Sequence, residues 1–261
     1  MPYPLRINGL EKSYGGQHVL GPIDLDLEAG TITAIIGRSG SGKTTLLRCL
    51  GGLEQPTAGR ITIGDGQVSP ADIGYVFQEP RLMPWLTVAK NTGFGLAGFT
   101  KPARDLAIAE ALDLVGLPDA GALLPKQRSG GMAQRVALAR ALAPHPKLIL
   151  LDEPFSALDP FTREQMQDHL LHLHEHYGAT MVLITHDMDE ALALALRIIV
   201  LDGPPGRIIG DFSPDLPRPA DRVSAAFFVW KRRLTALFTR QSAPPPEAAF
   251  SDQQPAQENF P

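Results

Sequence analysis

Near the start of the chain, three segments alternate apolar and polar residues one by one. They are LRINGLEKSY at 5–14, IDLDLEAG at 23–30 and GRITIGDGQV at 59–68. A two-residue period is typical of strands with one solvent-exposed face, which occur mainly in antiparallel sheets. These segments therefore predict antiparallel β structure.

Three other segments are almost wholly apolar: TITAIIG at 31–37, KLILLD at 147–152 and TMVLITH at 180–186. Short saturated runs that alternate with helical segments are typical of parallel strands buried on both faces. The stretch from about 87 to 142 contains ARDLAIAEALDLVGL and GGMAQRVALARALA and is too long for a simple crossover. We expect an α/β fold with an inserted helical subdomain at 87–142.

After RIIVLDGPPGRIIGDF at 197–212 the composition shifts toward proline and charged residues. SAAFFVWKRRLTALF predicts an amphipathic helix within 221–240, with three basic residues beside its apolar positions. A basic helix of this kind could contact a membrane or a partner, but we expect it to pack on its own domain. From Gln241 onward there is too little apolar content to form a core, so 241–261 are expected to be disordered. The apolar positions of the helix are Phe227, Trp230, Leu234 and Leu237.

Composition narrows the classes of function. The 261 residues are 44% hydrophobic, enough for a substantial core. With 24 basic and 28 acidic residues the formal charge is −4, so the overall charge gives no electrostatic attraction to nucleic acid. Cys49 is the only cysteine, which excludes an internal disulfide and favours a reducing compartment. We expect neither an export signal nor a membrane-spanning segment.

The segment GRSGSGKTT at 37–45 stands between a predicted strand and a leucine-rich segment and satisfies the phosphate-loop pattern G-x-x-x-x-G-K-[ST]. Glycines let backbone N–H groups converge, and the following helix adds its positive end. Lys43 is expected to reach the β and γ phosphates, and the Thr44 hydroxyl to bind Mg²⁺. The residues expected to surround the phosphates are Gly37, Arg38, Ser39, Gly40, Ser41, Gly42, Lys43, Thr44 and Thr45.

Carboxylates and a histidine follow two other buried strands. LILLDEP ends in Asp152, a candidate for the Mg²⁺ shell, and Glu153, a candidate for polarising an attacking water. His186 follows TMVLIT, where α/β sheets bind ligands, and could contact the γ-phosphate or the water. These residues predict nucleoside triphosphate hydrolysis.

A second candidate anion site opens the helical segment RSGGMAQRVALARAL. Ser129, Gly130 and Gly131 place a hydroxyl and bare amides at a helix start. One chain then has two phosphate-binding helix ends, which is explained if the second end completes the pocket of a neighbouring copy.

The phosphate loop, RSGGMAQR, LILLDEP, SALD and THD, in this order, resemble the ATP-binding subunits of ABC transporters over about residues 5–210. The resemblance implies a P-loop NTPase fold with a RecA-like core, an antiparallel β subdomain and a helical subdomain, together forming an ATPase domain at 1–220. It also implies an ATP sandwich dimer, most simply a homodimer, although a paralogue could be the second subunit. The signature usually begins with leucine, whereas this chain has Arg128. The resemblance therefore does not extend to the strength of dimer closure.

The same resemblance assigns roles to individual residues. Tyr14 is similar to the aromatic that stacks on adenine, and Gln78 to the glutamine that touches Mg²⁺ and the reacting water. Gln134 and Asp159 are implied to contact the nucleotide. With Glu153, His186 and Lys43, Gln78 completes the expected catalytic set.

FQEPRLMPWLTVAKN, GPPGRI and FFVWKRRL are similar to the nitrate, sulfonate and taurine importer branch. This implies a peripheral subunit on the cytoplasmic face of the inner membrane. It would bind transmembrane permease subunits through residues 81–86, with Met83 and Trp85 as anchors, and would serve an external solute-binding protein indirectly.

Other functions stay open at this point. A soluble ABC ATPase in DNA repair or cofactor assembly would lack the membrane partner, and a P-loop kinase would leave RSGGMAQR without a purpose. A nucleotide-gated module without turnover is disfavoured by Glu153 and His186. His169, His172 and His176 of DHLLHLHEH fall on one helical face and could bind zinc, or could belong to a solvated amphipathic helix.

Overall fold

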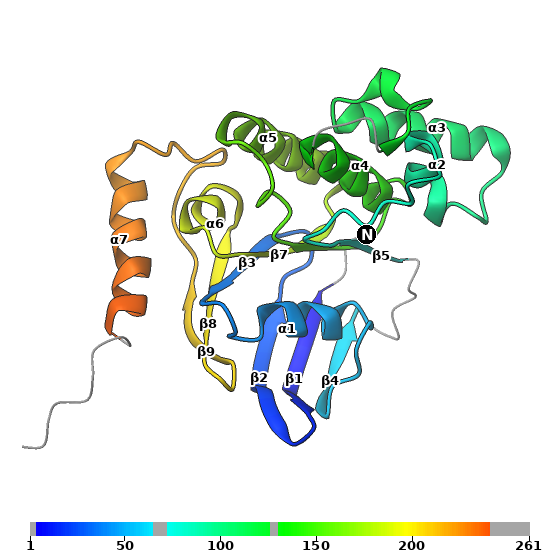
Figure 1. Ribbon diagram of the computed structural model, residues 1–261. Coiled ribbons are helices and arrows are strands. Elements are labelled where there is room, and N and C mark those ends of the chain that lie inside the picture. The colour runs from blue at the N-terminus through cyan, green and yellow to red at the C-terminus, as the bar shows by residue number, and fades with distance from the viewer. Residues whose placement is uncertain (1–3, 65–71, 126–129, 241–261) are drawn as a thin grey trace, which may run out of the picture.

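The fold consists of two sheets and a layer of helices (Figure 1). The structure is a computed structural model, and it describes residues 4–64, 72–125 and 130–240. The predicted α/β class and the antiparallel β subdomain are confirmed. Arg128, Ser129 and the tail at 241–261 lie outside the described residues, and so do the expectations that concern them.

The larger sheet has six strands in the order β5-β6-β7-β3-β8-β9. All adjacent pairs are parallel except β8 with β9, which is antiparallel. The three saturated segments form adjacent central strands, as predicted, because only a sheet covered on both faces can bury every side chain of a strand. The strands are β3 (Ile32–Gly37), β5 (Ile73–Val76), β6 (Leu148–Asp152), β7 (Thr180–Thr185), β8 (Arg197–Asp202) and β9 (Arg207–Phe212).

Successive side chains of the central strands enter two different hydrophobic cores. Leu148 and Leu150 lie in the core shared with the smaller sheet, whereas Ile149 and Leu151 lie in the core under the helices. This alternation is the ordinary pleat of a strand. It explains why these strands carry no polar periodicity.

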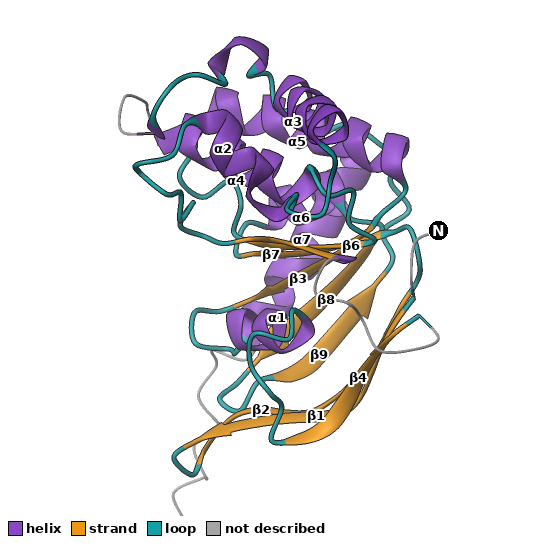
Figure 2. Ribbon diagram, turned by 90° about the vertical axis from the view of Figure 1, so that its right-hand side faces the viewer, coloured by secondary structure: helices purple, strands orange, loops and turns teal. Residues whose placement is uncertain are grey.

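The smaller sheet is antiparallel, with the order β2-β1-β4. It consists of β1 (Leu5–Tyr14), β2 (Gln17–Leu27) and β4 (Ala58–Ile63). Helix α1 (Lys43–Leu50) lies between the two sheets (Figure 2), and its residues Leu46, Leu47 and Leu50 enter their shared core. The alternating segments thus form antiparallel strands, as predicted, and β4 ends at Ile63, before the undescribed stretch 65–71.

The other face of the large sheet is covered by helices. The stretch expected to form the helical subdomain contains α2 (Val88–Thr92), η2 (Gly93–Gly95), α3 (Lys101–Leu114), η3 (Pro118–Ala120) and α4 (Gly130–Leu142). Next along the chain come α5 (Pro160–Tyr177) and α6 (Met188–Leu194).

The last helix, α7 (Ala225–Arg240), packs on its own domain, as predicted. Phe227 and Leu234 are buried in the core, and Trp230 and Leu237 pack against it at the helical spacing seen in the sequence. Among the described helices, none combines the length and the apolar character that a membrane span requires.

Candidate nucleotide site

Four adjacent parallel strands of the large sheet end at the same edge, and a candidate residue follows each of them. Gln78 follows β5, Glu153 follows β6, His186 follows β7, and the phosphate loop follows β3. The carboxyl edge of a parallel sheet is where α/β proteins bind ligands. The strand order therefore brings together residues that are up to 149 positions apart in the sequence, from Gly37 to His186.

The backbone of the phosphate loop requires its glycines. Gly40 and Gly42 have φ values of +81° and +86°, which side chains rarely adopt. A Cβ at Gly37 would stand 2.1 Å from the carbonyl oxygen of Leu201 on the neighbouring β8. Helix α1 begins at Lys43, directly after Gly42, and Gly42 provides no side-chain cap. The N–H groups of the first turn are thus available to an anion at the positive end of the helix.

Lys43 is buried at the base of this loop, with 7% of its surface exposed. Its Nζ donates to the carbonyl oxygens of Gly37 at 2.9 Å and of Arg38 at 2.8 Å. Burial lowers the pKa of Lys43, and the nearby carboxylates of Glu153 and Asp152 oppose this shift. The ammonium therefore braces the loop, and a phosphate group would partly offset its desolvation.

Asp152 and Thr44 form a pair of oxygen ligands beside the loop. The Thr44 hydroxyl donates to Oδ1 of Asp152 at 3.2 Å, and Asp152 is 4% exposed. Burial raises the pKa of Asp152, whereas the hydrogen bond from Thr44 lowers it. A hydroxyl and a carboxylate are the ligands that Mg²⁺ prefers, and a cation would offset the burial of this carboxylate. The residues present fit Mg²⁺.

Glu153 lies between Gln78 and His186. Gln78 Nε2 donates to Oε2 of Glu153 at 3.2 Å, and His186 Nδ1 lies 3.3 Å from the same oxygen. Glu153 has φ +45°, and its N–H donates to the carbonyl oxygen of Ile184 on β7. A non-glycine residue in this region stores backbone strain, which persists only where its surroundings hold it. The strain and the β7 contact fix the carboxylate in front of the loop.

These residues surround one cavity of about 500 Å³. Val19 of β2 also lines it, a residue that sequence reasoning missed because an apolar strand residue carries no chemical signal. The lining residues are Val19, Ser39, Gly40, Gly42, Lys43, Thr44, Thr45, Gln78, Glu153 and His186.

Other predicted residues lie outside this lining. Arg38 donates to the carbonyl oxygen of Phe238 on α7. Tyr14, at the end of β1, donates from its hydroxyl to Glu54, and Lys12 Nζ lies 4.8 Å from the centre of its ring. Ser41 is fully buried, and its hydroxyl has no hydrogen-bond partner among the described residues.

Gly130 and Gly131 of the second anion site also lie outside the lining of the cavity, and so do Gln134 and Asp159, which the resemblance assigns to the nucleotide. Gly130 and Gly131 begin α4, as expected for a helix start. Gln134 is buried in that helix and donates to the carbonyl oxygen of Phe77 at 3.3 Å. Asp159 caps α5 by accepting from the N–H of Thr162, and this bonding lowers the pKa of Asp159. None of these residues contributes to the cavity of its own chain.

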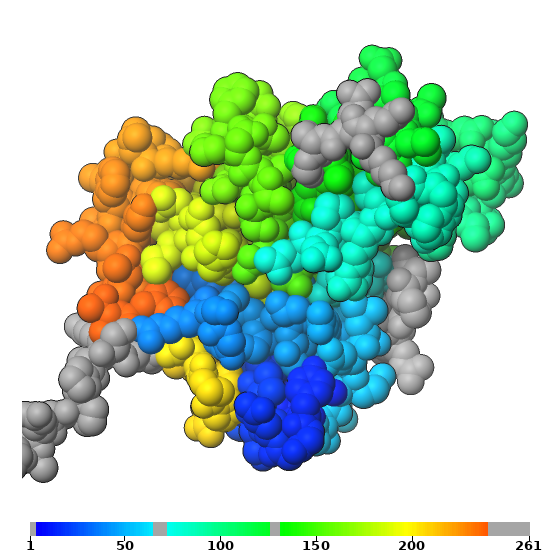
Figure 3. Space-filling model, in the orientation of Figure 1, coloured from blue at the N-terminus to red at the C-terminus, as the bar shows by residue number. Residues whose placement is uncertain are grey.

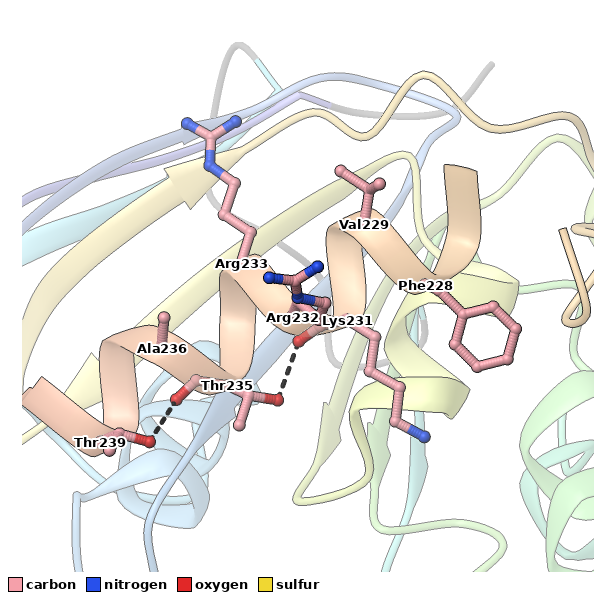
Figure 4. Close-up of a pocket in the computed structure, with 8 residues that line it drawn as sticks. All are labelled: Phe228, Val229, Lys231, Arg232, Arg233, Thr235, Ala236 and Thr239. Atoms are coloured by element: carbon pink, nitrogen blue, oxygen red, sulfur yellow. Dashed lines mark hydrogen bonds between the residues drawn. The ribbon is translucent and has the colours of Figure 1, made fainter. Parts of the chain in front are cut away.

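A larger and more open hollow of about 870 Å³ lies along α7 (Figure 4). Its described lining consists of basic, apolar and threonine side chains and contains no carboxylate, so it lacks the groups that hydrolysis requires. The histidine-rich helix α5 provides no alternative metal centre, since the described residues contain no group of three His, Cys, Asp or Glu suited to a metal ion. His174, a further histidine of α5, donates from Nε2 to the carbonyl oxygen of Gly30 at 2.9 Å.

Sequence comparison identifies relatives over most of the chain. The profile of the family described as ABC transporter matches residues 20–156. The aliphatic sulfonates import ATP-binding protein SsuB 1 of Xanthomonas axonopodis pv. citri is 48% identical over 223 residues, which are 84% of this chain and 88% of the relative. The aliphatic sulfonates import ATP-binding protein SsuB 3 of Pseudomonas syringae pv. tomato is 43% identical over 251 residues, which are 95% of this chain and 91% of the relative.

Solved structures with this fold are ATP-binding cassettes. The cassette MJ0796, in a dimeric post-hydrolysis state bound to ADP and Pi, has a TM-score of 0.72 and 33% identity, covering 80% of this chain and 98% of the cassette. The protein cbiO1 from Clostridium perfringens, part of the transporter complex cbiONQ, has a TM-score of 0.76 and 26% identity, covering 92% and 100%.

Proposed function

The chain belongs to the ATP-binding subunits of ABC transporters, and from this membership we propose that it hydrolyses ATP to drive an importer of aliphatic sulfonates. The relatives named as sulfonate import proteins support the substrate class. The observation that carries the chemistry is the cluster of Glu153, Gln78 and His186 in front of the phosphate loop.

Within this cavity each residue has a distinct task. The amides of the loop and Lys43 hold the phosphates and neutralise the charge that builds up on the transferring phosphoryl group. Glu153 orients a water molecule and accepts its proton as the bond to the γ-phosphorus forms and the bond to the leaving ADP breaks. Gln78 and His186 keep the Glu153 carboxylate in place, and His186 is exposed enough to reach the γ-phosphate.

Thr44, Asp152 and Gln78 are the residues that would hold Mg²⁺ in this site. When bound, the ion supplies positive charge to the phosphate oxygens. The Thr44 to Asp152 hydrogen bond orients both oxygen ligands before the ion arrives.

Gly130 and Gly131 of the second anion site lie outside the lining of the cavity, which supports a role toward another copy of the chain. We infer a homodimer in which Ser129, Gly130 and Gly131 of one subunit complete the cavity of the other. Asp159, at the exposed start of α5, would lie along the same interface. The dimeric cassette among the structural neighbours supports this arrangement.

The proposed contact with the permease is the segment 81–86. Trp85 is 75% exposed, which is unusual for a large aromatic side chain and suits an interface anchor. Asn91 holds the backbone of this segment by donating to the carbonyl oxygens of Met83 and Leu86, and accepts from the N–H of Met83. The subunit would thus act at the cytoplasmic face of the inner membrane, and would serve a solute-binding protein only through the permease.

The hydrolytic role is tested with Glu153→Gln, which keeps the shape of the side chain and removes its basicity. The variant should bind Mg-ATP and dimerise but lose turnover by at least a hundredfold. ATP hydrolysis is measured as released phosphate, and dimerisation by light scattering. Turnover at the wild-type rate would refute the role of Glu153.

The transport role is tested in cells whose own copy of this gene is deleted, supplied with an aliphatic sulfonate as the sole sulfur source. Plasmid-borne wild type should restore growth and Glu153→Gln should not, while sulfate supports both strains. Equal growth of the deletion strain and the complemented strain on the sulfonate would exclude this substrate class. Co-purification with a membrane permease separates an importer subunit from a soluble ATPase.

A further inference from the structure

Arg38 of the phosphate loop is directed to the C-terminal end of α7. Its guanidinium donates to the carbonyl oxygen of Phe238, 200 positions away in the sequence. In the space-filling view, blue atoms from the early part of the chain adjoin the orange to red atoms of α7 (Figure 3). The phosphate loop thus has a tertiary contact that its sequence motif does not specify.

The position of Phe238 explains why an arginine suits this contact. Phe238 lies in the last described turn of α7, and its carbonyl oxygen accepts from the Arg38 guanidinium. The C-terminal end of a helix also carries a partial negative charge. A guanidinium at this end therefore stabilises the helix terminus while its own backbone stays in the phosphate loop.

The same helix also contacts the segment that follows His186. Lys231 Nζ lies 2.7 Å from Oδ2 of Asp189 in the first turn of α6. Figure 4 shows Lys231 and Arg233 leaving α7 on opposite sides, and it shows the hydrogen bond from Thr235 to the carbonyl oxygen of Lys231. The Thr235 hydroxyl also lies 3.5 Å from the sulfur of Met188.

α6 is closely linked to the catalytic edge. Its N-cap is Asp187, the residue after His186, and the Asp187 carboxylate accepts from the N–H groups of Asp189 and Glu190. A displacement of the first turn of α6 would therefore move the His186 backbone.

We propose that α7 is a positioning element of the ATP site, with Arg38 and Lys231 as its positioning residues. It holds the phosphate loop through Phe238 and the His186 segment through Asp189, and so fixes the two sides of the cavity relative to each other. The buried side chains Phe227 and Leu234 anchor it to the core. This inference rests on the proposed ATP hydrolysis and adds a part of the chain that the cavity itself does not include.

The experiment measures kcat and KM for Mg-ATP on the full chain, with Lys231→Met as the main variant. Arg232→Met is the matched control, because Arg232 is an exposed neighbour on the same helix and loses the same charge. Removing one partner of a partly exposed ion pair should lower kcat/KM about two- to fivefold. We expect this loss in Lys231→Met at an unchanged Tm, none in Arg232→Met, and recovery to near wild type in the swap Lys231→Asp with Asp189→Lys.

A double variant tests whether Arg38 acts through the same helix. Arg38→Met should by itself lower kcat/KM about two- to fivefold. In the double variant with Lys231→Met, the loss in kcat/KM should stay close to the larger of the two single losses. Multiplied losses, or equal kinetics of Lys231→Met and Arg232→Met, would overturn the proposal. If the wild type shows no ATPase activity, the proposed function fails, and the same variants compared for binding of a fluorescent ATP analogue still decide the role of α7.

Discussion

Glu190 is a buried carboxyl group whose proton should make stability depend on pH. It lies in the first turn of α6, is 5% exposed, and its Oε1 has no hydrogen-bond partner among the described residues. Burial is the main cause that raises the pKa of Glu190, from 4.5 to about 8, and the Asp187 carboxylate adds to the shift. The charge of Arg163, whose Nη1 lies 3.6 Å from Oδ2 of Asp187, opposes the shift, and so does a hydrogen bond with Thr185, but burial outweighs both. We therefore predict a protonated Glu190 in the folded protein at neutral pH.

The sign and size of the effect follow from linkage. Between pH 4.5 and about 8 the folded chain holds this proton and the unfolded chain does not. The stability that the proton contributes is fully present below pH 4.5 and is lost as the pH rises through about 8. The loss is about 1.4 kcal/mol per pH unit in the middle of this window, or about 2.5 kcal/mol between pH 5.5 and 7.5.

The assay is urea unfolding of the wild type and Glu190→Gln at pH 5.5 and 7.5. Glutamine has nearly the same shape and cannot ionise, so the variant does not lose this contribution. From pH 5.5 to 7.5 its free energy of unfolding should therefore rise by about 2.5 kcal/mol relative to that of the wild type. Glu79→Gln, at an exposed position, is the control and should show no such gain. A constant difference between the wild type and Glu190→Gln at both pH values would refute a raised pKa.

Three further substitutions test the fold, the loop and the proposed permease contact. Gly42→Ala should lower the free energy of unfolding by more than 1 kcal/mol and weaken ATP binding, because φ is +86° and a Cβ would stand 2.5 Å from Leu20 Cδ2; urea unfolding and nucleotide titration check this. Leu234→Ala removes a fully buried side chain between α7 and the core and should cost about 2–5 kcal/mol, measured by the same unfolding assay. Trp85→Ala should leave the ATPase activity of the isolated subunit unchanged but weaken its co-purification with the permease by at least tenfold.

Much of the fold could be predicted because its signals are local. A strand with one exposed face alternates apolar and polar residues, whereas a strand buried on both faces is apolar throughout. These two patterns distinguish β1 from β6. Glycines at positive φ likewise mark the phosphate loop, since other residues rarely adopt this conformation. Such properties depend on a residue and its nearest neighbours, so one sequence is enough to reveal them.

The properties that the sequence did not reveal depend on distant parts of the chain. Arg38 has the same side chain whether it faces a phosphate or the end of α7, and only the packing of α7 decides between these. The motif assigns Gln134 to the nucleotide, and its hydrogen bond to the carbonyl oxygen of Phe77, 57 positions away, is a tertiary contact that the motif does not reveal. Glu190 looks like an ordinary acidic residue in a first helical turn, and its burial by neighbouring elements is a tertiary effect.

Different elements hold the different parts of the site in place. Glu153 has a strained backbone, and it is held by a hydrogen bond to Ile184 in the central, fully buried strand β7. A catalytic carboxylate needs this support because small displacements cost rate steeply. The phosphate loop and the start of α6 follow β3 and β7 at the same edge, beyond the last residues of these strands. Helix α7 contacts both segments, through Phe238 and Lys231, and so restrains them from outside the sheet.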